Sequence, residues 1–298
     1  MAGKRVAVVT GSNSGIGRAS ALRLAEYGFR VYATVRRPET ADEMLEHATE
    51  KQLDLEVLPL DVTDNDSITA AISAILDKNP SVDVLVNNAG VSAPGIVEEA
   101  SEDAFRAAME VNFYGALRCM RAVLPAMRAQ HSGCLVNVTS LSGRIASPEL
   151  APYVASKWAL ESICEALAFE SALFNIRVAI IEPGLIKTRM LRRRDQRTVS
   201  GPYYRQLQRM VSFYNAMLPG AAEPSEVAEA ILHAITTGEP KLRYLVGWPS
   251  APIGGGRARM TDEEWVGLGG MPTDEEYYAE FERLFGLSIR PEQEEESA

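Results

Sequence analysis

Cysteine and histidine are scarce in this sequence, with three of each among 298 residues. Cys119, Cys134 and Cys164 match neither the paired spacing of a disulfide framework nor that of a zinc site. The histidines are scattered and form no cluster of ligands. We therefore expect no metal site built by the protein and a reducing, cytoplasmic location.

Long hydrophobic runs and an excess of positive charge are also missing. No apolar segment approaches the length that crosses a bilayer, and residues 1–9 lead into a strand pattern instead of a signal peptide. The net charge of −10 disfavours a nucleic-acid partner. Hydrophobic residues make up 46% of the chain, which is enough for a full core. We expect a folded globular protein without a membrane span.

Short apolar runs alternate with longer helical patterns through the first two thirds of the chain. The runs are near-continuously apolar, as in strands buried on both faces of a parallel sheet, and occupy residues 5–10, 30–35, 55–60, 82–87, 134–140 and 177–182. Helical patterns lie between them at residues 15–28, from about 40, 65–77, 101–128 and 152–174. This order predicts an α/β fold with a doubly wound parallel sheet, a three-layer Rossmann fold. Such sheets bind ligands at the carboxyl ends of their strands.

The pattern is looser after residue 182. Residues 187–222 form an insert that begins with a basic run, and a helix at 224–237 and a strand at 243–246 follow it. Residues 250–270 are rich in glycine and proline and predict a loop, whereas 273–285 predicts a helix with acidic residues in its first turn. We expect one domain over residues 1–290 and an acidic tail at 291–298.

The turn after the first predicted strand has the composition of a phosphate-binding loop. It reads Thr10 to Gly17, and its candidate cofactor contacts are Gly11, Ser12, Asn13, Gly15, Ile16 and Gly17. Glycines let the backbone approach a pyrophosphate, and the helix N-terminus supplies amide donors. A flexible turn with chance glycines is the alternative, which the strand–turn–helix context disfavours.

The end of the second predicted strand bears on the choice of cofactor. An acidic residue there would bind the adenosine 2′-hydroxyl of NAD, whereas arginine suits the 2′-phosphate of NADP. This chain has Arg36 and Arg37 and no acid, which favours NADP. Two solvated surface arginines are the alternative.

Two further strand ends suit the same dinucleotide. Asp61 and Val62 follow the third strand, where a carboxylate could accept from the adenine amine or could cap the next helix. Asn88, Ala89 and Gly90 follow the fourth strand, where small residues let the backbone lie against a ribose. An ordinary turn would have the same composition.

Ser140, Tyr153 and Lys157 form the candidate catalytic group. Tyr153 and Lys157 are four residues apart, so they share one face of a helix. The pKa of a tyrosine is ordinarily ~10. An adjacent ammonium favours the phenolate and makes the tyrosine a better proton shuttle. Ser140, at a strand end, can hold a substrate oxygen by a hydrogen bond. An exposed Tyr/Lys pair is common, but this pair follows both a phosphate loop and a strand-end serine.

In their order along residues 5–188, these motifs resemble the short-chain dehydrogenase/reductase family, and within it the NADP-preferring 17β-hydroxysteroid and retinol dehydrogenases. The resemblance implies that Asn112 joins a proton relay through water and that Lys157 binds the nicotinamide ribose. It also implies that Pro183, Gly184, Ile186 and Thr188 cover the nicotinamide. Some NADP-binding members carry a basic residue where this chain has Ser14, so here the 2′-phosphate would rest on Arg36 with Ser12 or Asn13.

The resemblance implies an NADP-dependent oxidoreductase acting on a lipophilic ketone, aldehyde or secondary alcohol. A 3-oxoacyl carrier-protein or CoA reductase shares the same catalytic residues, and a non-catalytic dinucleotide sensor is the alternative from another class. We expect residues 187–222 to form a substrate lid. By analogy with the family, we also expect a homodimer that pairs through helices 101–128 and 152–174.

Overall fold

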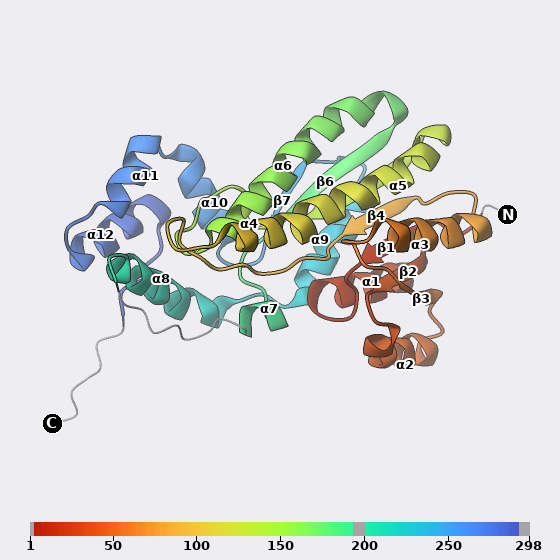
Figure 1. Ribbon diagram of the computed structural model, residues 1–298, viewed down its shortest axis with the longest axis horizontal. Coiled ribbons are helices and arrows are strands. Elements are labelled where there is room, and N and C mark those ends of the chain that lie inside the picture. The colour runs from red at the N-terminus through yellow and green to blue at the C-terminus, as the bar shows by residue number, and fades with distance from the viewer. Residues whose placement is uncertain (1–2, 193–200, 292–298) are drawn as a thin grey trace.

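The computed structural model describes residues 3–192 and 201–291. A parallel sheet of seven strands runs through the molecule in the order β3-β2-β1-β4-β5-β6-β7 (Figure 1). The strands are β1 (Val6–Thr10), β2 (Arg30–Val35), β3 (Leu55–Pro59), β4 (Val84–Asn87), β5 (Gly133–Val138), β6 (Ile176–Pro183) and β7 (Arg243–Val246). The predicted α/β class and the doubly wound parallel sheet are confirmed.

Helices cover both faces of this sheet and give it two hydrophobic cores. Helices α1 (Gly15–Tyr27), α2 (Asp42–Glu50) and α9 (Pro224–Thr236) pack on one face. On the other face lie α3 (Asn65–Lys78), α5 (Ala116–Ala129) and α6 (Ala151–Ser171). Strand residues point alternately to the two cores, so Ala7 and Val9 belong to one and Val6 and Val8 to the other. This double burial explains the near-continuous apolar runs.

The strand order reverses between β1 and β4, which are neighbours in the sheet. The chain steps outward from β1 to β2 and β3 on one side, then returns to β4 and continues to β7 on the other. Turns that leave β1 and β4 therefore diverge to opposite faces and leave a crevice between them. This switch point lies beside Gly11 and Ala89, which are close neighbours.

The single helix predicted over residues 101–128 is wrong in one respect. The segment is α4 (Glu102–Met109), a π-helical turn η2 (Glu110–Gly115) and α5. Gly115 lies where a Cβ atom would come within 2.8 Å of Val62 Cγ2, so the helix passes close to the strand end after β3. π-helical turns inside helices are frequent at functional sites.

The predicted loop at residues 250–270 is wrong. It contains α10 (Ser250–Arg259) and α11 (Asp262–Gly269), and α12 (Asp274–Phe285) follows. Thr261 and Glu264 form a capping box that starts α11. Gly256 lies in α10 where a Cβ atom would come within 3.0 Å of the Leu284 carbonyl, so this glycine permits close helix packing. Gly256 thus allows α10 and α12 to pack closely.

Helices α8 (Tyr204–Met217), α10, α11 and α12 gather at one end of the molecule, beyond the sheet (Figure 1). A third hydrophobic cluster holds them together, and it includes Met217, Ile253, Leu268, Phe281 and Phe285. This C-terminal helical end, together with α7 (Arg189–Arg192), forms the surroundings of the cleft described below.

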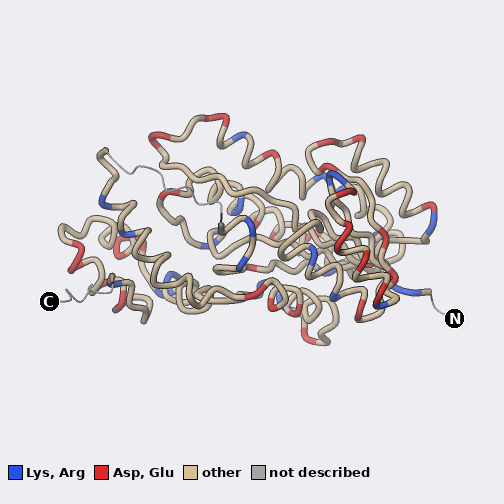
Figure 2. Tube along the Cα trace, turned by 90° about the horizontal axis from the view of Figure 1, so that it is seen from below, with Lys and Arg blue, Asp and Glu red and all other residues tan. Residues whose placement is uncertain are grey.

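Several predictions concern residues outside the described ranges. The acidic tail lies there from residue 292, as do Arg193, Arg194 and Arg197 of the basic run and residues 193–200 of the expected lid. Along the described chain, acidic and basic residues are interspersed (Figure 2). No helix within it is long and apolar enough to cross a bilayer. The three cysteines are buried and unpaired.

Candidate functional site

A cleft of about 670 Å³ runs along the carboxyl edge of the sheet. The turns after β1 to β6 line one part of it, and the C-terminal helical end lines the other. Nearly all the candidate residues meet there, although they come from segments spread over 180 positions of the chain.

The turn after β1 is shaped by two glycines with left-handed backbone. Gly11 has φ +68° and Gly15 has φ +56°, a region that favours glycine. A Cβ atom at Gly11 would lie 2.8 Å from Ala89 Cα, and one at Gly15 would lie 3.1 Å from Thr188 Cγ2. The Asn88 side chain donates to the carbonyls of Thr10 at 2.9 Å and Gly11 at 3.2 Å. The loop is therefore fastened to the strand end after β4.

Ser12 is placed differently from its prediction as a cofactor contact. Its side chain is fully buried, its hydroxyl donates to the Val9 carbonyl at 2.8 Å, and its amide donates to the Thr34 carbonyl at 3.0 Å. Both donors are thus used inside the turn. Asn13 and Ile16 do line the cleft. Gly17 is buried against the Asn88 side chain and the Gly11 carbonyl, so it serves close packing.

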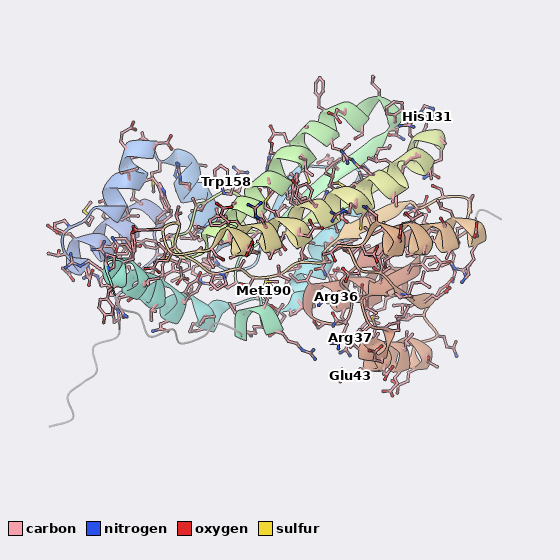
Figure 3. The ribbon with its side chains drawn as sticks, in the orientation of Figure 1. Arg36, Arg37, Glu43, His131, Trp158 and Met190 are labelled. Atoms are coloured by element: carbon pink, nitrogen blue, oxygen red, sulfur yellow. The ribbon has the colours of Figure 1, made fainter. Side chains whose placement is uncertain are left out.

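Arg36 and Arg37 follow β2 and lie beside α2, on the far side of the molecule from Trp158 (Figure 3). Both are exposed and line the cleft, and neither forms an ion pair with another described residue. Glu43, which is labelled near Arg37 in this view, is paired with Arg18 at 2.6 Å. This part of the cleft therefore presents two positive charges.

Asp61 is not the cap of the next helix, which settles one of the two alternatives. Asp64 is the N-cap of α3, and its side chain accepts from the amides of Asp66 and Ser67. Asp61 instead accepts from the amide and the hydroxyl of Thr63 at 2.9 and 2.8 Å. Partial burial raises the pKa of Asp61, but these hydrogen bonds and the Arg36 charge outweigh it and keep the pKa below its usual value. Asp61 and Val62 both line the cleft.

The catalytic candidates come together from two elements. Ser140 follows β5 and caps a 3-10 turn, η3 (Leu141–Gly143), by accepting from the Ser142 amide at 3.1 Å. Tyr153 and Lys157 lie on α6, with Lys157 Nζ 5.8 Å from the centre of the Tyr153 ring. The ammonium donates to the Val138 carbonyl, at the end of the same strand, at 2.9 Å. All three candidates line the cleft.

Lys157 is a buried cation, 4% exposed. Burial lowers the pKa of Lys157 to about 8, although the charges of Cys164 and Glu161 partly oppose this. The group therefore titrates close to neutral pH, where a small change in its surroundings alters its charge.

Asn112 lies in the π-helical turn, beside the cleft and 1% exposed. Its Oδ1 accepts from the Val91 amide at 2.8 Å, and its Nδ2 donates to the Val91 carbonyl at 3.1 Å and to Ser156 Oγ at 2.9 Å. The side chain thus joins the strand end after β4 to α6. Gly90 packs against it, since a Cβ atom there would lie 3.2 Å from Asn112 Oδ1.

The segment after β6 completes the cleft. Gly184 donates to the Val246 carbonyl at 2.9 Å, and a Cβ atom there would lie 2.7 Å from the Trp248 carbonyl oxygen. Pro183, Gly184, Ile186 and Thr188 all line the cleft. The close approach to the chain after β7 fixes the course of this segment.

Sequence reasoning missed a large part of the cleft wall. From the expected lid segment 187–222, Met210, Phe213 and Tyr214 of α8 line the cleft. Side chains of the last three helices also take part, among them Ile253, Trp265, Leu268, Tyr277, Phe281 and Phe285. Arg209 fastens α8 to this end: its Nε donates to Asp274 at 2.9 Å, and its guanidinium lies 4.4 Å from the Tyr277 ring centre. Thr261 followed by Glu264 was the signal that could have revealed α11.

Comparisons with known proteins agree with this geometry. The family model described as short chain dehydrogenase matches residues 5–198. Human 17-beta-hydroxysteroid dehydrogenase type 1 is 35% identical over 254 residues, which cover 81% of this chain and 77% of that protein.

Solved structures give the same result. A short-chain dehydrogenase from Streptomyces avermitilis superposes with a TM-score of 0.77 at 33% identity and covers 91% of this chain and 100% of its own. Actinorhodin polyketide ketoreductase, solved with NADPH, gives a TM-score of 0.72 at 30% identity and covers 82% of this chain and 97% of its own.

Proposed function

Because this chain belongs to the short-chain dehydrogenase family, we propose that it is an NADP(H)-dependent oxidoreductase acting on a lipophilic ketone or aldehyde, or on the corresponding secondary or primary alcohol. The observation that carries the proposal is the buried Lys157 ammonium beside Tyr153, with Ser140 on the same cleft. When bound, the cofactor would supply or accept the hydride at its nicotinamide ring.

The residues along the sheet edge suit a dinucleotide. The glycine turn with Asn13 and Ile16 would hold the pyrophosphate, and Asp61 with Val62 would face the adenine. The ribose beside the nicotinamide would lie against Asn88, Ala89 and Gly90. The segment Pro183, Gly184, Ile186 and Thr188 would cover the nicotinamide.

The preference for NADP rests on Arg36 and Arg37. Two exposed guanidinium groups at the end of β2, without ion-pair partners among the described residues, suit a 2′-phosphate. Glu43, an acid near Arg37, is already paired with Arg18. The neighbour solved with NADPH gives further support.

Proton transfer falls to Tyr153. Its hydroxyl gives a proton to the substrate oxygen in reduction and takes one in oxidation, since it is the acid–base group on the cleft beside the ammonium. The Lys157 charge favours the phenolate form of Tyr153 and so eases the transfer. Ser140 donates a hydrogen bond to the same substrate oxygen and holds it in place. The Asn112 side chain hydrogen-bonds both α6 and the strand end after β4 and so holds the two together.

The substrate would lie between Ser140 and the C-terminal helical end. Met210, Phe213, Ile253, Phe281 and Phe285 line that part of the cleft, and their side chains favour an apolar ligand. The expected lid over residues 187–222 remains a prediction, and its described part includes α7 and α8. The turnover assay distinguishes this function from the two alternatives, a 3-oxoacyl thioester reductase and a non-catalytic sensor.

Turnover with purified protein tests the proposal. NADPH and then NADH are supplied with steroid, retinoid, aliphatic and 3-oxoacyl carbonyl compounds, and cofactor oxidation is followed by absorbance. We expect faster oxidation with NADPH and with the free lipophilic ketones or aldehydes. Preference for 3-oxoacyl thioesters would contradict the substrate class. Binding of NADPH without oxidation by any carbonyl would contradict the enzymatic function and favour a sensor.

A further inference from the structure

A buried group of charged side chains lies behind the strand end that carries Ser140. Glu161 on α6 and Glu182 on β6 are 5% and 0% exposed. Arg243 on β7 reaches both, with its Nε 3.1 Å from Glu161 Oε2 and 3.5 Å from Glu182 Oε1. Arg144 adds a second guanidinium 3.4 Å from Glu182 Oε1. Burying carboxylates is costly unless they are paired, so two of them at this depth call for a reason.

Glu161 is the member of this group that contacts the catalytic elements. Its Oε1 accepts from the Thr139 hydroxyl at 2.7 Å. Thr139 stands between Ser140 and Val138, whose carbonyl accepts from Lys157. Glu161 also follows Lys157 by one helical turn, so both project from one face of α6. One carboxylate therefore joins the strand end to the helix that carries Lys157.

The turn after Ser140 packs against the same carboxylate side chain. A Cβ atom added at Gly143 would lie 2.9 Å from Glu161 Cγ, so no larger residue fits there. The Gly143 amide donates to the Ser140 carbonyl at 2.8 Å, and Ser140 Oγ accepts from the Ser142 amide. The place of the Ser140 hydroxyl thus depends on the contact between this turn and Glu161.

We propose that Glu161 is a positioning residue of the catalytic centre: Arg243 holds its carboxylate, and the carboxylate holds the Thr139–Ser140 strand end against Lys157. The inference rests on the proposed function, because it assigns a role in the same reaction. A misplacement of about 1 Å can cost about a hundredfold in rate, so loss of this clamp acts on kcat. Most of the proposed cofactor contacts lie at the other strand ends, so we expect cofactor affinity to be largely retained.

Two variants remove the clamp in different ways. Glu161→Ala deletes both contacts of the carboxylate, and Thr139→Val deletes only the hydroxyl with little change of shape. We expect kcat to fall about a hundredfold in the first and about tenfold in the second, with NADPH affinity within about twofold of wild type. Thr139→Val leaves the buried ion pairs of Arg243 in place, so it tests the proposal if Glu161→Ala folds poorly.

A conservative variant and a matched control sharpen the test. In Glu161→Gln the amide can accept from Arg243 and donate to Thr139 Oγ1, whose own proton goes to the Ile181 carbonyl 3.0 Å away. This variant should restore kcat to within about threefold of wild type. Glu165→Gln is the control, since Glu165 pairs with the same Arg243 at 2.6 Å from the exposed side of α6. It should keep the wild-type kcat.

The titration of Lys157 provides a readout that does not need turnover. The groups near its ammonium are Tyr153, Glu161 and Cys164 on α6. Arg243 on β7 contacts Glu161 and Glu182 on β6, and Arg144 after η3 contacts Glu182. Since the negative charge of Glu161 raises the pKa of Lys157 against the effect of burial, Glu161→Gln should lower that pKa below about 8. Any alkaline limb of kcat then moves to lower pH, whereas Glu165→Gln leaves it in place. NMR of 13C-labelled lysine follows the same titration without turnover, so it can also be used if the protein is inactive.

The outcomes separate this inference from the proposed function. If wild type turns over and both Glu161→Ala and Thr139→Val keep its kcat, the positioning role is overturned. A loss in Glu161→Gln as large as that in Glu161→Ala also overturns it, because the hydrogen-bond geometry is retained. Wild type without turnover contradicts the proposed function instead. The positioning role then stands or falls on the Lys157 NMR signal, which should change in Glu161→Ala and Thr139→Val and stay unchanged in Glu165→Gln.

Discussion

The two ends of the cleft are built in different ways. At the cofactor end, each contributing segment directly follows a strand, so the sheet fixes where Gly11, Arg36 or Asp61 stands. At the far end, the wall comes from α8 and α10–α12, which a hydrophobic cluster and the Arg209–Asp274 ion pair hold together. A position set by a strand end is local in the sequence. A position set by packing depends on residues from different helices, such as Arg209 and Asp274, which are 65 positions apart, and the sequence carries little sign of it.

Replacing Tyr153 tests the chemistry at the end of the cleft that the strand ends build. It should have the largest effect on activity. Tyr153→Phe keeps the ring and removes the hydroxyl that we propose exchanges the proton. We expect single-turnover oxidation of NADPH to fall by about a thousandfold while cofactor affinity stays nearly unchanged. Fluorescence titration with NADPH serves as the control for binding. Activity within about tenfold of wild type would remove Tyr153 from this role.

Reversing the charge at Arg36 tests whether the end of β2 selects the cofactor. In Arg36→Asp the carboxylate would repel a 2′-phosphate and could accept from the free 2′-hydroxyl of NADH. A charge-assisted hydrogen bond contributes roughly 1.5–3 kcal/mol, so with repulsion added the preference should change by more than about a hundredfold. The measurement is the ratio of kcat/KM for NADPH to that for NADH.

Arg37 is the neighbour that could compensate, so Arg36→Asp with Arg37→Ala is measured alongside. An unchanged ratio in both variants would make the two arginines ordinary surface residues. The NADP assignment would then be wrong, while the argument for Ser140, Tyr153 and Lys157 would stand.

The homodimer predicted by family analogy concerns a third region, the outer face of α6. On α6, Trp158 and Phe169 are 48% and 88% exposed, and Leu173, in the 3-10 turn directly after α6, is 90% exposed (Figure 3). Apolar side chains of this size on a surface helix are suited to an interface. We expect light scattering to give twice the chain mass at micromolar concentration, and Phe169→Glu with Leu173→Glu to halve it. A monomeric wild type would contradict the prediction.

The same contrast explains which features the sequence could predict. The seven strands follow from apolar runs, so their prediction was close to the structure. The glycine turn after β1 and Ser140, Tyr153 and Lys157 do line one cleft, while their roles remain predictions. The side-chain role of Ser12 was not predictable, because its hydroxyl turns inward to Val9. The glycines at 254–256 predicted a loop. Gly254 instead packs against Leu245 and Gly256 against Phe285, and these tertiary contacts are not visible in the sequence pattern. The role of Glu161 was not predicted for the same reason, since its partners are Thr139, directly after β5, and Arg243 on β7.

Shortening a side chain in the cleft wall formed by α8 and α10–α12 should weaken substrate binding without changing cofactor affinity. Phe281 is buried, lines the cleft and lies 4.6 Å from Phe285 between ring centres. In Phe281→Ala we expect KM for a bulky lipophilic ketone to rise about tenfold, with NADPH affinity unchanged, because one large apolar contact is worth about 1.5–3 kcal/mol. Phe281→Leu keeps more of the volume and should give a smaller change. A rise in the NADPH dissociation constant of the same size would show that the two ends are not independent.

The smallest expected effect concerns the start of α11, where the sequence-based prediction of a loop was wrong. The Thr261 hydroxyl accepts from the Glu264 amide at 3.1 Å, and the Glu264 carboxylate accepts from the Thr261 amide at 2.9 Å. Thr261→Ala removes one half of this capping box and should cost about 1 kcal/mol, whereas Thr261→Ser retains the hydroxyl and should cost little. In a chain of this size the change in Tm is about 2 °C, so hydrogen exchange is the sharper measurement. The amides of residues 262–269 should exchange several times faster in Thr261→Ala than in Thr261→Ser, while those of β1 and β4 stay unchanged. Equal exchange in the two variants would mean that packing alone holds α11, and the capping box would then contribute nothing to this wall of the cleft.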